Sequence, residues 1–271
     1  MTPSEEAHTT QNVGADAAAP ASELRALIAV GRQAAEQLHA SGDPEAEAII
    51  VALFARATLT AEAVALLCEH GYGQQAMAAN RILFELLVDL RWTIANQELA
   101  KERFVQHARF DQHLRRQVAR RYPALFPPAG EAAGLEADEI AELQRLFGAY
   151  GHKSWTGLSM HERVRAIADQ FPEGVARQNL WTYHDVLHRL NNSEVHPSSW
   201  SLGRILRRVP REDGTEMLQF RIEVESELAA YAAGQAWWLY GELTSAVVDH
   251  FRLPRERLEQ LARRAPFGGA G

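Results

Sequence analysis

The stretch from Gln74 to Asn96 constrains the fold more than any other part of the chain, because it is apolar on most of its circumference. A surface helix keeps a polar face, whereas a helix that is apolar nearly all round has to be buried. Two other strongly apolar segments at helical spacing, 45–69 and 226–251, can pack against it. The sequence therefore predicts an all-α protein, a multi-helix bundle with the 74–96 helix near its centre.

Helical periodicity extends over most of the remaining chain. It predicts helices over residues 21–41, 98–122, 137–150 and 160–170, and a further helix that opens at Pro172. One region differs, because alternating apolar residues in 202–209 and 217–224 flank a turn at 210–214. This pattern is typical of a β-hairpin. We expect a small accessory β-hairpin, at about residues 202–224, before the last long helix.

Composition bounds the class of protein. The net charge of -7 argues against a globally basic nucleic-acid binder, and the lone Cys68 cannot form an intramolecular disulfide. No apolar run reaches the roughly 18 residues of a membrane span. Residues 1–20 are expected to form a disordered tail, 21–264 a single helical domain and 265–271 a flexible tail. We expect a soluble, cytoplasmic protein with no membrane partner.

A polar stripe crosses the central apolar helix. Arg81, Glu85 and Asp89 follow one another at intervals of four residues, so they lie on one face. Arg81 can pair with Glu85 on the adjacent turn. Two interpretations follow: an internal ion pair that sets the register of the helix, or one polar wall of a site.

The stretch from Tyr183 to Leu202 holds the densest set of reactive side chains. His184 and His188 lie one helical turn apart with Asp185 between them, a superficial likeness to the zinc-protease motif, which has Glu where this chain has Asp. His107 and Asp111 have the same spacing but no obvious third ligand. We expect no metal and no cofactor. The spacing alone does not decide whether His184 and His188, or His107 and Asp111, bind a metal ion.

Arg189 and His196 suggest a different chemistry. An arginine can stabilise charge on a phosphate while a histidine transfers the proton of a ribose 2′-hydroxyl, and the two together suffice for RNA cleavage without a metal. An arginine followed after four to six residues by histidine near a helix end resembles the HEPN ribonuclease pattern, although Leu190 stands where that superfamily usually has a polar residue. The resemblance implies a site shared across a homodimer. A structural role is the alternative: Asn191, Asn192, Ser193 and His196 would cap the helix end.

A second resemblance covers much of the chain. It rests on Gly71-Tyr-Gly, Arg81-Ile-Leu-Phe-Glu85, Lys153-Ser-Trp155-Thr-Gly157, Tyr183 and Ser193-Glu-Val-His196-Pro-Ser. Their order and spacing, over about residues 45–205, resemble the bacterial DUF5677 family of helical proteins. That resemblance implies a helical fold without supplying a reaction, and it singles out Arg81, Glu85, Tyr183 and His196.

Two functional hypotheses follow from these residues. In the first, the protein is a metal-independent endoribonuclease of a defence or toxin type, with His196 as general acid and base, Arg189 as phosphate stabiliser, and Arg81 and Glu85 in support. Basic helix and hairpin ends, at 115–121 and 204–208, favour RNA as the partner. In the second, a non-enzymatic helical module binds a small ligand or a protein in a polar pocket between the Arg81 helix and the Tyr183 helix, with Asn192 and Ser193 among its polar groups.

Overall fold

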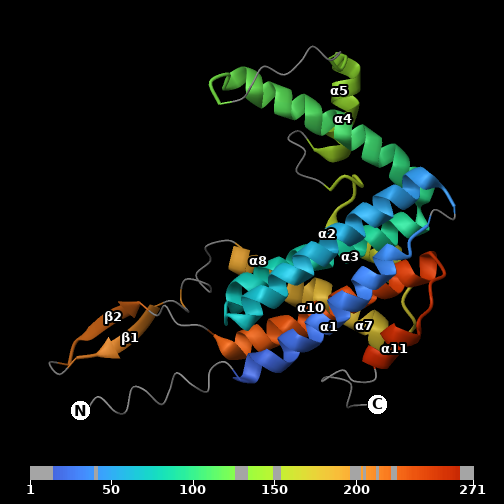
Figure 1. The fold of residues 1–271 in the computed structure, drawn as a ribbon. Helices are drawn as coiled ribbons and strands as arrows, with labels where there is room; N and C mark the ends of the chain where they lie inside the picture. Colours follow the sequence, from blue (N-terminus) through green and yellow to red (C-terminus); the bar gives the residue numbers. More distant parts are fainter. Residues whose placement is uncertain are drawn as a thin grey trace.

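The computed structural model describes residues 15–39, 42–125, 134–148, 154–195, 203, 206–211, 214–220 and 225–262. Four long helices form the body of the molecule: α1 (Ala15–Glu36), α2 (Pro44–Glu69), α3 (Gly73–Ala95) and α10 (Ser226–His250). They pack side by side (Figure 1). The predicted all-α bundle is confirmed.

Helix α3 lies at the centre of this body, as its apolar circumference predicts. Leu83, Phe84, Leu87, Val88 and Leu90 have no exposed surface. Helices α2 and α10 flank it, and α1 packs across both of them. One continuous apolar cluster therefore joins all four helices.

Local signals set the ends of α2 and α3. The Asp43 side chain accepts hydrogen bonds from the first turn of α2, and Pro44 occupies the first helical position, where its missing N–H costs nothing. After α2 the chain turns at Gly71, whose φ of 74° suits glycine. Gly73 then starts α3 against the backbone of α10: a Cβ there would lie 2.7 Å from the Ala229 nitrogen. These features hold α2, α3 and α10 in close contact.

Helices α4 (Gln97–Arg121) and α5 (Ala137–Phe147) project from the body as an arm (Figure 1). The arm has its own small apolar cluster, formed by Phe110, Leu143 and Phe147. Where the arm meets the body, Phe104 of α4 contacts the edge of the Trp155 ring. A hollow separates the rest of α4 from α2 and α3.

A chain of short elements crosses α3: α6 (Met160–Ala168), α7 (Val175–Thr182), the π-helix η1 (Tyr183–Leu187) and α8 (His188–Val195). Ser159 and Glu162 form a capping box at the start of α6, as the sequence suggests. The region predicted as one helix from Pro172 instead contains a wide turn at η1, where the His188 N–H bonds to the Tyr183 carbonyl five residues earlier.

The predicted hairpin is present, and its described strands lie within the expected range of about 202–224. Its strands, β1 (Leu206–Pro210) and β2 (Glu216–Phe220), pair antiparallel with Leu206 opposite Phe220. The last helix, α11 (Glu256–Ala262), follows α10. Helix α1 begins at Ala15, inside the segment 1–20 expected to be a tail, and the predicted tail 265–271 lies outside the described residues.

Among the described residues, α2 alone is long and apolar enough to cross a membrane by length and composition. A helix packed in the core of a soluble protein passes the same test, so this result carries little weight by itself. Its most apolar window of 18 residues is 39% buried inside the protein.

The close approach at Gly73 gives a stability prediction. Gly73→Ala should lower the free energy of unfolding by about 1–3 kcal/mol, because the added methyl overlaps the α10 backbone. Alanine is the better helix former by itself, so a loss reports the overlap. Urea unfolding measures it. Gly134→Ala, where a Cβ meets nothing within 4 Å, is the matched control, and equal stability of the two variants would contradict the packing described.

Candidate functional site

The polar cluster lies where α8 crosses α3. The Arg81 guanidinium donates through Nε to Glu85 Oε1 at 3.0 Å and through Nη1 to Asn192 Oδ1 at 2.8 Å. His188, one turn before Asn192, places its Nε2 3.6 Å from Glu85 Oε1, which is an electrostatic contact rather than a hydrogen bond. The predicted Arg81–Glu85 pair is confirmed within α3, and the hydrogen bond from Arg81 to Asn192 joins α3 to α8.

Two opposing effects act on Glu85. Burial acts to raise the pKa of this carboxyl, but the neighbouring His188 and the positive charges of Arg81 and Arg163 outweigh it, so the pKa lies below its ordinary value. Glu85 is therefore ionised at neutral pH. It is the anionic centre of a partly exposed cluster.

Histidines extend the cluster along the short helices. The rings of His188 and His184 are parallel with centroids 6.5 Å apart, and His161 of α6 lies 5.4 Å from His184. Phe84 and Trp181 border this row. His161 was not expected from the sequence, because only folding brings α6 beside η1. The row leads from the surface of α6 to Glu85.

Tyr183 belongs to a different, buried network. Its hydroxyl donates to Gln235 Oε1 of α10 at 3.0 Å and accepts from Asn191 Nδ2 at 3.2 Å. Burial raises the pKa of Tyr183 far above its ordinary value. Asn80 of α3 also donates to Gln235, at 3.4 Å. Tyr183 is 2% exposed, so it serves the core and does not face the site.

The wide turn of η1 makes this network geometrically feasible. Tyr183 and Asn191 are eight residues apart and would point about 80° away from each other in a regular α-helix. A turn that holds one extra residue brings them close to the two-turn spacing of about seven residues. Both side chains therefore reach Gln235.

Asp89 forms the third polar contact of α3. Its carboxylate accepts hydrogen bonds from the buried Arg163 guanidinium of α6 and, at 3.0 Å, from Trp155 Nε1. Burial raises the pKa of Asp89, although Arg163 and Trp155 favour its ionised form. This contact holds α6 and the segment before it against α3.

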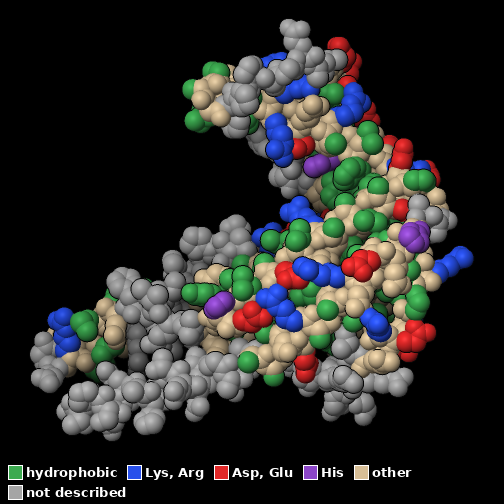
Figure 2. All heavy atoms as spheres, viewed as in Figure 1, with side chains coloured by type: hydrophobic (Ala, Val, Ile, Leu, Met, Phe, Trp, Pro, Cys, Tyr) green, Lys and Arg blue, Asp and Glu red, His purple; other side chains and the backbone are tan. Residues whose placement is uncertain are grey.

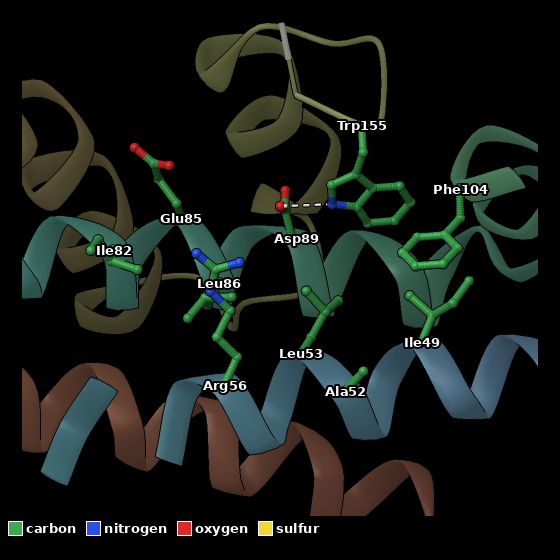
Figure 3. Close-up of a pocket in the computed structure, with 10 residues that line it drawn as sticks. All are labelled: Ile49, Ala52, Leu53, Arg56, Ile82, Glu85, Leu86, Asp89, Phe104 and Trp155. Atoms are coloured by element: carbon green, nitrogen blue, oxygen red, sulfur yellow. Dashed lines mark hydrogen bonds between the residues drawn. The ribbon is translucent and has the colours of Figure 1, made fainter. Parts of the chain in front are cut away.

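A pocket of about 310 Å³ opens beside Asp89, between α2, α3, α4 and Trp155 (Figure 3). Its walls are mostly apolar, with Phe104 and the Trp155 indole at one end. Besides Asp89, which is held by Arg163, Glu85 adds a negative group and Arg56 a positive one. Between the Arg81 helix and the stretch that follows Tyr183, Arg81 bonds directly to Asn192. The pocket lies on the α2 side of α3.

Of the two proposed catalytic residues, the structure describes Arg189, which is not part of the polar cluster. Arg189 is on α8, and its side chain is exposed. No carboxylate pairs with it in the part of the chain that the structure describes. His196 and the side chain of Ser193 lie outside the described residues. The structure thus brings Arg81, Glu85, His188 and Asn192 together, while Arg189 faces solvent.

The two metal hypotheses find little support in the geometry. Asp111 pairs with Arg115 at 2.6 Å, and His107 packs against Phe147. His184 Nδ1 lies 2.7 Å from its neighbour Asp185. Within the described residues, no three His, Cys, Asp or Glu side chains are grouped to hold a metal ion.

The Asp89–Arg163 pair gives a second stability prediction. Arg163→Met or Asp89→Leu alone should lower the free energy of unfolding by about 3–5 kcal/mol, because each leaves a buried charge without its partner. The double variant should lose less than the sum. Arg165→Met, exposed on the same helix, is the control. Simple additivity of the two losses in urea unfolding would argue against coupling.

Glu85 gives a prediction about pH. Because its folded-state pKa is depressed, its contribution is present above the unfolded-state pKa and is lost as pH falls through the folded-state value. Glu85→Gln should therefore cost stability at about pH 7, by less than about 1 kcal/mol for this partly exposed group, and cost progressively less below about pH 4. Urea unfolding at a series of pH values measures it. A cost that stays constant or grows on acidification would disprove this account.

Comparison with known proteins agrees with the family resemblance. No curated protein and no solved structure matches the chain. The model of DUF5677, a family of unknown function, matches residues 47–215, which includes α3, η1, α8 and the polar cluster. Since this match spans more than half of the chain, the protein belongs to the DUF5677 family.

Proposed function

We propose that this protein is a metal-independent endoribonuclease that acts at the surface of α8, in the cytoplasm and as a homodimer. The observation that carries the proposal is Arg189: an exposed guanidinium that no described carboxylate neutralises, on a helix whose last residue, Val195, directly precedes His196. An arginine left free in this way can bind a phosphate.

The reaction would run without a metal. His196 accepts the proton of a ribose 2′-hydroxyl, and the 2′-oxygen attacks the adjacent phosphorus. The bond from phosphorus to the 5′-oxygen breaks, and that oxygen takes up the proton that His196 accepted. Arg189 stabilises the negative charge on the phosphoryl oxygens. The products are a 2′,3′-cyclic phosphate end and a free 5′-hydroxyl.

The polar cluster supports this role indirectly. Arg81 holds Asn192, and the buried Tyr183–Asn191–Gln235 network holds the opposite side of α8. Helix α8 is therefore fixed at two points on α3 and α10. A rigid support is what a catalytic pair at its end requires.

The test is RNA cleavage in the presence of EDTA. Structured and unstructured RNAs should be cut by the parent protein and leave 2′,3′-cyclic phosphate ends. Arg189→Ala and His196→Ala should each reduce the rate by about a hundredfold or more. Arg165→Ala removes an exposed arginine from α6 and should leave the rate unchanged. Intact RNA with the parent, or full activity of His196→Ala, would refute the proposal.

The pocket beside Asp89 favours a second candidate, a small-ligand-binding module. Its volume of about 310 Å³ is at the lower end for ligand sites. Aromatic walls and two opposite charges would suit a small molecule with an apolar body. In that case RNA stays intact, and a ligand changes the fluorescence of Trp155.

A further inference from the structure

Helix α2 carries a regular strip, the α2 strip, at positions 48, 52, 55, 59, 62 and 66, of which five are exposed and apolar and one is a half-buried acid. Its members are Ala48, Ala52, Ala55, Leu59, Glu62 and Leu66. Leu59 is 68% exposed and Leu66 51% exposed, on a helix whose most apolar window of 18 residues is 39% buried. The single chain thus leaves much of its most apolar helix uncovered.

The arrangement of the arm explains why the α2 strip is open. Helix α4 contacts the body near Trp155 and then diverges from α2 and α3 (Figure 1). Hydrophobic side chains follow α2 across the face shown in Figure 2, beside the hollow below α4. Ile82 of α3 and Phe104 of α4 are also exposed, and both line the pocket at the closed end of the hollow.

We propose that a second copy of this chain covers the α2 strip, with the two α2 helices packed antiparallel about a two-fold axis. The intervals along the strip alternate between four and three residues, the spacing that keeps a seam facing a partner helix. A two-fold axis makes each strip its own partner. The residues of the strip therefore have to fit against the same residues in reverse order.

The strip is complementary to its own reverse. With the axis near Ala57, Ala48 faces Leu66, Ala52 faces Glu62 and Ala55 faces Leu59 of the other copy. Every alanine faces a longer side chain of the other copy. No two large side chains therefore oppose each other across the contact.

Charge also favours a second copy. The whole chain carries a net charge of -7, which makes two copies repel at most surfaces. The one acid of the strip, Glu62, is already paired with Arg25 and Arg32 of α1, so the strip adds no unpaired negative charge to the contact. A strip about 27 Å long supplies only part of the roughly 800 Å² per partner of a stable pair. Ile82 and Phe104 in the hollow supply further apolar contact.

The pairing deepens the proposed function, which calls for a homodimer, although its evidence is independent of RNA cleavage. Helices α2 and α3 run antiparallel through a short turn, so an axis near Ala57 is level with Glu85. The polar clusters of both copies would thus lie level with the middle of the α2 pair. Each copy could then contribute to the α8 surface of the other, where RNA is proposed to bind.

The experiment is the molar mass of the full chain in solution. Light scattering after size exclusion, at tens of micromolar, should give twice the mass of one chain. Leu59→Glu places a charge opposite an alanine near the axis and should raise the dissociation constant at least about thirtyfold. Val175→Glu changes another exposed apolar residue, 73% exposed on α7, and should leave the dimer intact. Circular dichroism confirms folding of both.

Two outcomes would overturn the proposal. One is a monomeric parent, including a monomer that instead binds vesicles of phosphatidylcholine and phosphatidylglycerol through α2. The other is a folded Leu59→Glu variant that dimerises as tightly as the Val175→Glu control. Loss of RNA cleavage without loss of the dimer would count against the proposed function alone.

Discussion

Helix α3 carries polar side chains through an apolar core, and each of them has to meet a partner because a buried polar group without one is costly. The partners come from different elements. Asn80 bonds to α10, Arg81 to α8, and Asp89 to Arg163 of α6. The polar groups of one helix therefore decide where three other elements sit. The polar cluster around Glu85 is the part of this arrangement that reaches the surface.

Much of the fold follows from local pattern. Apolar periodicity is enough to predict the long helices, and the Gly- and Pro-bounded turns mark their ends. The Arg81–Glu85 pair could be predicted too, since it depends on one helical turn. Asn192 as a partner of Arg81 could not, because 111 residues separate them and no rule of spacing links the two. The same holds for His161 beside His184.

The site was harder to predict than the fold for a physical reason. Tyr183 and Asn192 are close in sequence and polar, yet one is sealed in the core and the other faces the cluster. The direction of each depends on the wide turn at η1, and nothing in the residues from 183 to 187 is specific to such a turn. Trp155 and Arg163 lie in the site region because both donate hydrogen bonds to Asp89.

The wide turn at η1 also bears on how related chains can vary in length. It absorbs one residue between Tyr183 and Asn191, so a chain with one residue fewer there could form a regular α-helix and keep both contacts to Gln235. A chain of equal length has to keep the turn or lose one contact. An alignment gap at this position would therefore mark a change of helix type and not a change of core.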